Sequence, residues 1–513
     1  MAAAENGGLP GGKVGGMGDV IRDLPKALAR RGHRVSVLTP SYGFLAKASA
    51  VRAIGTVKVR FAGALETCEW LAAPGDSGGV DHYLLESPRF SPRGDARIYH
   101  DDGGAAPFAT DATKFAFFSA AAGALVGELE RPPDVLHLHD WHLGLLLLLR
   151  RYDPRYAALK AIRTVFTIHN LALQGTRPLD DADSSLKRWF PDLDVPADIV
   201  ADPRFADCVN PLAVAIRLAD MLNTVSPTYA SEIVVPGDEK RGSRGGEGLE
   251  ALLAARDRQG ALIGILNGCE YRQSPPPKPT WKGLVALMRE ELLGWIARGV
   301  YVDAGAYLAE RQIGELPGGS PAVIATSIGR VTEQKLALLR QQVGRTATAL
   351  DRVLAVLDPG VLILLGSGDP EYERFLNEAM LRHPNFLFLK GYSDRLAEAL
   401  YAAGDVFLMP SVFEPCGISQ MLAMSAGQPC VAHAVGGLRD TVTTANGFPF
   451  GGATPRQQAQ NFVRQVAAAV KTRFDRPERW LALTNAARGE RFTWDASAGR
   501  YLTEVYAFDG VTG

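Results

Sequence analysis

Glu414 stands out chemically because it lies in a short turn between an apolar run, residues 405–409, and a segment with the pattern of a helix, residues 419–426. The start of such a helix leaves backbone N–H groups free, and Gly417 lets a ligand approach them closely. The stretch therefore predicts a site for an anionic ligand beside a carboxylate. A structural turn in which Glu414 only caps the helix is the alternative.

Arg330 and Lys335 form a second candidate group, directly after the apolar segment 321–327 and at the start of a helical pattern over 333–346. Two cations beside a helix start suit a diphosphate, because they stabilise charge on a leaving phosphate without a metal. A pair of surface cations is the alternative.

The first part of the chain carries a glycine-rich loop at residues 11–19, which contains Lys13, Gly15 and Gly16. It opens directly onto an apolar stripe at helical spacing in residues 20–28. Backbone N–H groups in such a loop can face a phosphate, and Lys13 adds a mobile cation. The sequence is neither a Walker A motif nor GxGxxG, so a flexible loop is the alternative.

A histidine-rich segment, residues 134–142, ends a predicted strand with His137 and His139 on one face and Asp140 beside them. Open parallel sheets bind ligands at the carboxyl ends of their strands, which favours contacts with sugar hydroxyls. A metal site that also includes His142 is the alternative, although this spacing is not an established zinc signature.

His169 and Asn170 end a second β-branched strand, residues 163–168. A histidine satisfied by hydrogen bonds in the core is the common fate of a lone His. The position at a strand end, beside Asn170, favours a role in a site.

Strand, turn and helix patterns recur along the whole chain and predict an α/β fold with two doubly wound, Rossmann-like domains. Extra antiparallel strands are expected between residues 41 and 97. A proline-rich connection marks the boundary, which gives domains 1–272 and 273–490. Residues 491–513 predict a terminal helix that crosses back to the first domain.

Composition limits the class of protein. The chain has 513 residues, 47% hydrophobic and 22% charged, with a net charge of −1, which fits two domains without nucleic-acid bias. Its cysteines number 5 and include no CxxC pair, which indicates a reducing compartment. No secretory signal or membrane-spanning run is evident, so the sequence predicts a cytoplasmic protein without a membrane partner. The sequence leaves the oligomeric state open.

Taken together, these motifs resemble those of the bacterial glycogen synthase and starch synthase family, glycosyltransferase family 5. They occur in the family's order, at residues 13–16, 139–141, 167–170, 224–229, 265–268, 329–335 and 413–417. The resemblance implies a GT-B architecture, two Rossmann-like domains facing an interdomain cleft. It also implies retaining transfer of glucose from ADP-glucose to the non-reducing end of an α-1,4-glucan, with no cofactor and no metal.

The resemblance assigns roles residue by residue. The catalytic group it implies is His169 beside the anomeric centre, Asp140 near the sugar, Arg330 and Lys335 on the diphosphate, and Glu414 on the glucosyl hydroxyls. The substrate-binding group it implies is Lys13, the Gly15 and Gly16 amides, Asn170, Asn267 near the acceptor, Tyr392 near the nucleotide, Cys416, and the amides of Gly417, Ile418 and Ser419. Glu414 is expected to position the sugar. A carboxylate nucleophile would need a second acid about 5–5.5 Å away, and the sequence shows no candidate for it.

The sequence departs from the family pattern at several positions. Val14, Val412, Leu336 and Glu270 stand where the family commonly has Thr, Arg, Gly and Asp. Residues 1–4 leave room for only part of a first strand. Two functional alternatives stay open: a related transferase that uses UDP-glucose or another donor, and a non-catalytic homologue that binds glucan or nucleotide.

Overall fold

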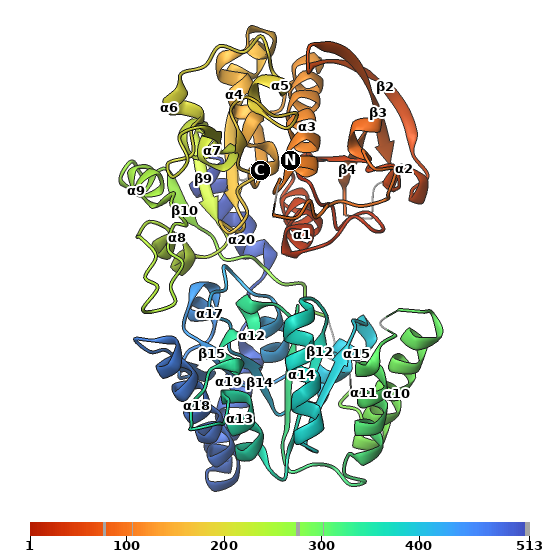
Figure 1. The fold of residues 1–513 in the computed structure, drawn as a ribbon, viewed down its shortest axis with the longest axis vertical. Coiled ribbons are helices and arrows are strands. Elements are labelled where there is room, and N and C mark those ends of the chain that lie inside the picture. Colours follow the sequence, from red (N-terminus) through yellow and green to blue (C-terminus); the bar gives the residue numbers. More distant parts are fainter. Residues whose placement is uncertain (75–77, 105, 273–276, 301, 508–513) are drawn as a thin grey trace. The chain divides into compact units, whose positions relative to one another are not determined.

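The computed structural model describes residues 1–74, 78–104, 106–272, 277–300 and 302–507 (Figure 1). These residues form two compact units. Unit 1 comprises residues 1–236, 245–268 and the chain from 493 onward, and unit 2 comprises residues 237–244 and 269–492. Residues 273–276 of the proline-rich boundary and residues 508–513 of the expected terminal helix lie outside the described residues.

Unit 1 is built on a sheet in two four-stranded parts, with strand orders β1-β4-β3-β2 and β10-β9-β6-β5. The strands are β1 (Val35–Pro40), β2 (Arg52–Phe61), β3 (Ala64–Ala73), β4 (Val80–Glu86), β5 (Val135–His139), β6 (Arg163–Ile168), β9 (Met221–Thr224) and β10 (Leu262–Gly264), with a separate ribbon of β7 (Arg177–Pro178) and β8 (Cys208–Val209). β2, β3 and β4 pair antiparallel, which confirms the extra antiparallel strands predicted for this region.

Ala2 joins the two parts of this sheet. It forms parallel bridges to Leu38 of β1 and Leu138 of β5. The Ala2 N–H donates to the His137 carbonyl at 2.9 Å, and the Ala3 N–H donates to the Leu38 carbonyl at 3.1 Å. A bridge formed by the single residue Ala2 thus lies between β1 and β5. Ala2 and Ala3 are fully buried there.

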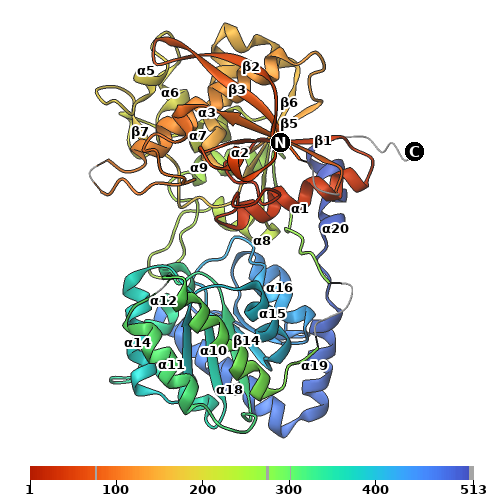
Figure 2. The ribbon, with the colours of Figure 1, turned by 90° about the vertical axis from the view of Figure 1, so that its right-hand side faces the viewer.

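Helices flank both faces of the unit 1 sheet (Figure 2). They are α1 (Gly16–Arg30), α2 (Leu45–Ala48), α3 (Ala109–Glu128), α4 (Gly144–Tyr152), α5 (Leu186–Trp189), α6 (Ala197–Val200), α7 (Pro211–Leu218), α8 (Pro227–Ile233), α9 (Glu250–Arg258) and α20 (Trp494–Arg500), with 3-10 turns η1 (Pro88–Phe90), η2 (Trp141–Leu143) and η3 (Pro154–Ala161) and the π-helical turn η4 (Tyr501–Val505). α20 packs beside α1, where Trp494, Ala498 and Tyr501 bury apolar surface with Val20 and Leu24. The end of the described chain therefore belongs to unit 1.

Unit 2 contains a six-stranded, fully parallel sheet with the order β13-β12-β11-β14-β15-β16. The strands are β11 (Ile324–Ile328), β12 (Val361–Gly366), β13 (Phe386–Lys390), β14 (Val406–Met409), β15 (Cys430–His433) and β16 (Gly447–Phe450). The order reverses between β11 and β14, so their carboxyl ends flank a topological switch point, where open α/β sheets bind ligands.

The helices of unit 2 cover both faces of this sheet. They are α10 (Trp281–Ala297), α11 (Ala304–Glu315), α12 (Glu333–Arg340), α13 (Ala349–Leu357), α14 (Pro370–Arg382), α15 (Asp394–Ala403), α16 (Ser419–Ser425), α17 (Gly436–Thr441), α18 (Pro455–Asp475) and α19 (Pro477–Gly489). α12 is shorter than the pattern over 333–346 predicts, because residues 341–348 fold into a turn closed by the Val343 N–H and the Ala347 carbonyl at 3.1 Å. Among the described residues, no helix combines the length and the apolar character needed to cross a membrane.

Candidate active site

The carboxyl ends of β5 and β6 bring Asp140 and His169 together in unit 1. The two strands pair in parallel with His139 opposite Thr167, so the residues that follow them emerge at the same edge of the sheet. The Asp140 Oδ1 atom accepts a hydrogen bond from the His169 backbone N–H at 2.7 Å, and the Asp140 N–H donates to the Thr167 carbonyl at 2.9 Å. Asp140 adopts a φ of 55° to make both contacts.

Burial strongly shifts the pKa values of Asp140 and His169. Burial raises the pKa of Asp140 to about 7, and the negative charge of Glu5 adds to the increase, although the backbone N–H groups of His169 and Asn170 oppose it. Burial lowers the pKa of His169 to about 3. At neutral pH the imidazole of His169 is therefore uncharged, and Asp140 is close to its midpoint of titration.

His169 is held by a second histidine. The Nε2 atom of His169 lies 3.0 Å from Nδ1 of His139. Burial also lowers the pKa of His139 well below its usual range, so the pair shares one hydrogen bond between two neutral rings. His139 in turn stacks on His137 with ring centroids 4.2 Å apart.

His137 belongs to a hydrogen-bonded chain in the core. Its Nδ1 atom lies 2.8 Å from the Tyr506 hydroxyl and its Nε2 atom 2.5 Å from Thr167 Oγ1. Thr167 Oγ1 donates to Asn223 Oδ1, and Asn223 Nδ2 donates to the Tyr501 hydroxyl. The histidines thus serve as hydrogen-bond partners. Among the described residues, no group of His, Cys, Asp and Glu is arranged to hold a metal ion.

The glycine-rich loop is organised by Glu5, which the sequence analysis did not assign to the site. The buried Glu5 Oε2 atom accepts hydrogen bonds from the N–H groups of Val14 at 2.8 Å, Gly15 at 2.7 Å and Gly18 at 3.3 Å. Its Oε1 atom accepts the Tyr99 hydroxyl at 3.0 Å. The sequence signal that could have identified Glu5 is a single carboxylate shortly after Ala2 and Ala3, which form hydrogen bonds with the sheet.

These contacts bear on Gly15, whose amide is predicted to contact the donor. In this structure the Gly15 N–H donates to Glu5 Oε2 at 2.7 Å, and its contact with a donor stays a prediction. Gly16 is exposed at the first position of α1, where helix N–H groups have no partner within the helix. Lys13 is exposed and pairs with Asp19 at 2.7 Å, which keeps its ammonium group beside this helix start.

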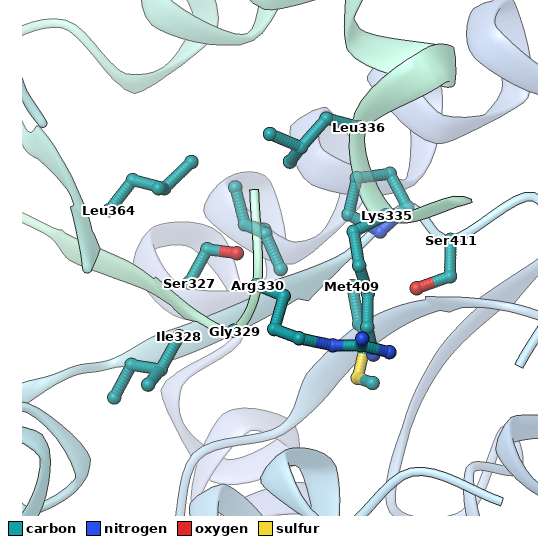
Figure 3. A pocket seen from close by; sticks show the side chains of 11 residues that line it. Ser327, Ile328, Gly329, Arg330, Lys335, Leu336, Leu364, Met409 and Ser411 are labelled. Carbon is teal, nitrogen blue, oxygen red and sulfur yellow. The ribbon is translucent and has the colours of Figure 1, made fainter. Parts of the chain in front are cut away.

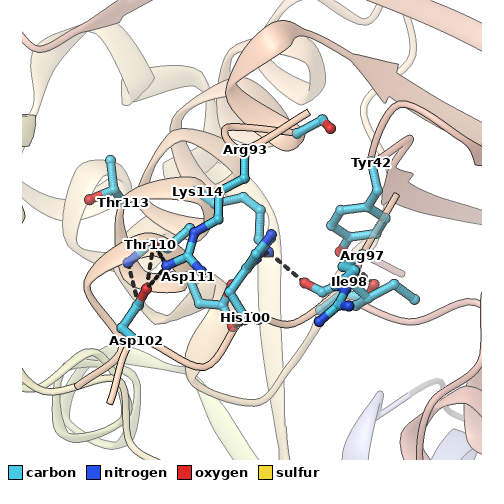
Figure 4. A network of polar contacts seen from close by, with 12 residues as sticks. Tyr42, Arg93, Arg97, Ile98, His100, Asp102, Thr110, Asp111, Thr113 and Lys114 are labelled. Carbon is cyan, nitrogen blue, oxygen red and sulfur yellow. Dashed lines mark hydrogen bonds and ion pairs between the residues drawn. The ribbon is translucent and has the colours of Figure 1, made fainter. Parts of the chain in front are cut away.

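A buried ionic network supports the segment that carries Tyr99 (Figure 4). The Lys114 ammonium group on α3 donates to the Ile98 carbonyl and to Asp111 Oδ1, and Asp111 also contacts His100. Nearby, Asp102 accepts the Thr110 N–H at 2.7 Å and pairs with Arg93. Burial lowers the pKa of Lys114, and the Asp111 charge opposes that effect. The network holds residues 98–102 on α3, and Tyr99 of this segment reaches Glu5.

Asn170 and Asn267 lie at the same edge of the unit 1 sheet. Asn170 Oδ1 accepts the Ala172 N–H at 3.0 Å. Asn267 is buried just beyond β10, and its N–H donates to the Val225 carbonyl at 3.2 Å. Its side-chain Oδ1 atom has no hydrogen-bond partner among the described residues. A buried acceptor without a partner is unusual in a folded protein and is consistent with a ligand contact.

Unit 2 places Arg330, Lys335 and Glu414 together at the switch point. A small pocket there is lined by residues of β11, α12, β12 and β14, such as Lys335 and Met409, and by Arg330 and Ser411 in the segments that follow β11 and β14 (Figure 3). Lys335 Nζ forms an ion pair with Glu414 Oε2, and Ser411 Oγ donates to the same oxygen at 3.1 Å. Arg330 is exposed and makes no hydrogen bond or ion pair with any other described residue, so its guanidinium group is available to an anion.

The turn that carries Glu414 packs closely against the start of α17. The Gly437 N–H of α17 donates to the Glu414 carbonyl at 3.1 Å. Gly436 has a φ of 43°, and a Cβ atom there would lie 1.9 Å from the Glu414 carbonyl oxygen. Only glycine therefore allows this approach.

Tyr392 and residues 416–419 lie at the same edge of the sheet but do not line the pocket. Tyr392 follows β13, is 59% exposed, and donates its hydroxyl to Asp394 at 2.8 Å. Gly417 has a φ of 79° and lies two residues before Ser419, the first residue of the short helix α16. Cys416 is buried and Ile418 is the residue before the helix.

Comparisons with known proteins agree with this architecture. A family model described as the starch synthase catalytic domain matches residues 1–255, and one described as glycosyl transferases group 1 matches residues 323–471. A glycogen synthase of Anaeromyxobacter sp. (strain Fw109-5) is 36% identical over 96% of this chain and 96% of that protein. A glycogen synthase of Streptococcus equi subsp. equi (strain 4047) is 31% identical over 98% of each.

Solved structures extend the comparison. The catalytic domain of Starch Synthase IV from Arabidopsis thaliana, bound to ADP and acarbose, superposes with a TM-score of 0.76 at 28% identity, over 98% of this chain and 97% of that one. Sucrose-phosphate synthase from Thermosynechococcus elongatus has a TM-score of 0.54 at 18% identity, a likeness of fold alone.

Two open α/β units with basic and carboxylate groups at the carboxyl edges of their sheets define a glycosyltransferase of the GT-B fold. The predicted fold class is confirmed. The chain belongs to the glycogen synthase and starch synthase family, as its motifs predicted, and it is a glucosyltransferase of glycogen or starch synthesis.

Proposed function

We propose that this protein transfers the glucosyl group of ADP-glucose to the non-reducing end of an α-1,4-glucan, with retention of anomeric configuration. The observation that carries the proposal is the Lys335–Glu414 ion pair beside the exposed Arg330 at the switch point of unit 2. Cations and a carboxylate side by side suit a donor that presents both a diphosphate and a sugar. The ADP and acarbose of the starch synthase structure are consistent with such a donor and acceptor.

In the proposed reaction, the bond between the anomeric carbon and the phosphate oxygen breaks, and the acceptor hydroxyl attacks from the same face. Arg330 and Lys335 stabilise the negative charge that develops on the leaving ADP, and the acceptor proton passes to the departing phosphate oxygen. Glu414 accepts hydrogen bonds from the glucosyl hydroxyls. Its pairing with Lys335 and Ser411 supports a positioning role, because it leaves the carboxylate fixed and charge-compensated.

We assign further roles to the remaining predicted residues in the same proposal. In unit 2, Tyr392 contacts the nucleotide, and the Gly417–Ser419 amides and Cys416 contact the donor. In unit 1, the residues proposed to contact substrate are Lys13, the Gly16 amide, Asp140, His169, Asn170 and Asn267. His169 acts as a neutral ring, because burial holds its pKa near 3.

The experiment measures ADP or UDP release and glucosyl incorporation into glycogen, with ADP-glucose and UDP-glucose supplied separately to the purified protein. We expect transfer with ADP-glucose. Arg330→Ala and Lys335→Ala should each lower kcat by about 100- to 1,000-fold, since one such donor contributes about 2.7–4 kcal/mol. Lys282→Ala is the matched control, because Lys282 is an exposed lysine of the same unit away from the pocket.

Three outcomes would contradict the proposal. Near-normal turnover in both variants would reject the leaving-group role of Arg330 and Lys335. Preferential UDP release would favour the alternative donor. Glucan binding without transfer would favour a non-catalytic homologue.

We also propose that the reaction needs no metal or other cofactor, because Arg330 and Lys335 can balance the diphosphate charge. A chelator should then leave the rate unchanged.

The free state of all five cysteines is consistent with the predicted cytoplasmic location, which cell fractionation would test.

A further inference from the structure

Residues 237–244 form a closed turn that packs on unit 2, although the chain on both sides of the turn belongs to unit 1. Asp238 and Ser243 pair in an antiparallel bridge, with N–H to carbonyl distances of 2.8 and 3.0 Å. Gln458 of α18 donates to the Arg241 carbonyl at 2.8 Å. The turn is therefore closed on itself and anchored to a helix of unit 2.

Arg244, at the end of this turn, contacts two segments of the unit 2 site. Its guanidinium carbon lies 5.0 Å from the centroid of the Phe413 ring, and its Nη2 atom lies 3.8 Å from Glu333 Oε2. Phe413 directly precedes Glu414, and Glu333 opens the helix that carries Lys335. A planar guanidinium can stack on a ring and face a carboxylate at the same time, which a lysine cannot do equally well.

The two segments that Arg244 contacts are already joined by the backbone. The Val412 N–H donates to the Gln334 carbonyl at 2.8 Å, and Gln334 Nε2 donates to the Phe413 carbonyl at 3.1 Å. The Lys335–Glu414 ion pair lies one residue further along both segments, so residues 333–335 and 412–414 meet along a continuous seam of contacts. Arg244 closes the outer end of the seam, where it covers Phe413 and the first turn of α12.

We propose that Arg244 is a positioning residue for glucosyl transfer, which holds the 412–414 turn against α12 and so keeps Glu414 and Lys335 in register. The inference rests on the proposed roles of Glu414 and Lys335. Its structural part, the closing of the seam, does not depend on the identity of the donor.

The test compares Arg244→Ala and Arg244→Lys with Arg241→Ala in the full chain. Arg241 is the matched control, because it lies in the same turn and its side chain pairs only with Asp238 among the contacts seen in the described residues. Hydrogen exchange of the peptide that contains the Val412 amide is read without substrate. Arg244→Ala should speed this exchange, and Arg241→Ala should leave it unchanged.

Kinetics give the second readout. Loss of one exposed cation–ring contact corresponds to about a two- to fivefold change, so kcat/KM for ADP-glucose should fall by that factor in Arg244→Ala. The KM for glucan should stay unchanged, and Arg244→Lys should recover only part of the loss, because it keeps the charge but not the planar stack.

Equal exchange and equal kcat/KM in Arg244→Ala and Arg241→Ala would overturn the proposal. A lower kcat/KM with unchanged exchange would also overturn it, since Arg244 would then act on the substrate directly. If the wild-type protein failed to use ADP-glucose, the proposed donor would be rejected while the exchange comparison would still decide the role of Arg244.

Discussion

His139 ends β5 and His169 directly follows the neighbouring parallel strand β6, and their Nδ1 and Nε2 atoms are 3.0 Å apart. One ring must donate and the other accept, so the contact requires that at least one of them stays neutral. Burial lowers the pKa of both rings, which favours the neutral pair. The arrangement fixes the orientation of His169 and leaves its Nδ1 side for other contacts.

The buried histidines should make the protein less stable in acid. The pKa of His169 and of His142 is about 3 in the folded protein, against an ordinary value of 6.5. The unfolded chain takes up protons below pH 6.5 while the folded protein does not, so their stabilising contribution is lost as the pH falls from about 6.5 towards 3. Urea unfolding at pH 7 and pH 5 would measure this decline.

Asp140 should act in the opposite direction over the same range. Its pKa is about 7 in the folded protein against an ordinary 3.8, so its contribution is present below about pH 3.8 and is lost as the pH rises towards 7. Asp140→Asn should therefore steepen the acid decline, because nothing then opposes the histidines. Asp194→Asn, at an exposed position of the same unit, is the control. A shallower decline in Asp140→Asn would contradict the pKa direction.

Glu5 should stabilise the glycine-rich loop. Glu5→Ala removes the acceptor of three backbone N–H groups, and Val14, Gly15 and Gly18 then lose their partner. Leaving such donors unsatisfied costs about 1–3 kcal/mol, so the free energy of unfolding should fall by about that amount and the KM for the donor should rise.

Two variants calibrate the Glu5 measurement. Tyr99→Phe removes only the hydroxyl contact and should cost about 1 kcal/mol. Glu239→Ala, at an exposed position, should change neither quantity. Equal unfolding free energies for Glu5→Ala and Glu239→Ala would show that the carboxylate does not organise the loop.

Gly436→Ala should disable catalysis through the Glu414 turn. The added Cβ would meet the Glu414 carbonyl oxygen at 1.9 Å, and the φ of 43° is unfavourable for alanine. A displacement of about 1 Å at a reacting site can cost about 100-fold in rate, so kcat should fall by at least that factor.

The control for this variant is Gly451→Ala, because a Cβ at Gly451 would have no neighbour within 4 Å. Circular dichroism would establish that both variants are folded. If folded Gly436→Ala kept the turnover of Gly451→Ala, the close approach of α17 would not position Glu414.

Local patterns predicted much of the fold. Apolar runs located strands such as β5, β6 and β14, and the residues at their ends, Asp140, His169 and Glu414, lie at sheet edges as predicted. This worked because strand periodicity and turn chemistry depend on neighbouring residues. The motif order along the chain also indicated the family, which the relatives confirm.

Other features were not visible in the sequence. The partner of the Gly15 amide is a carboxylate from the start of the chain, and His169 meets His139 because of the pairing of two strands. Residues 237–244 belong with unit 2, although the sequence on both sides follows unit 1. Each of these contacts joins segments that no local pattern relates.

The sequence by itself determined the two α/β halves, the family and the positions of Asp140, His169 and Glu414 after strands, because these depend on residue order and short-range patterns. Only the tertiary structure decided which groups are neutral and which are paired. Strand register set the contact between His139 and His169, burial raised the pKa of Asp140, and the packing of α12 against the 412–414 turn paired Lys335 with Glu414.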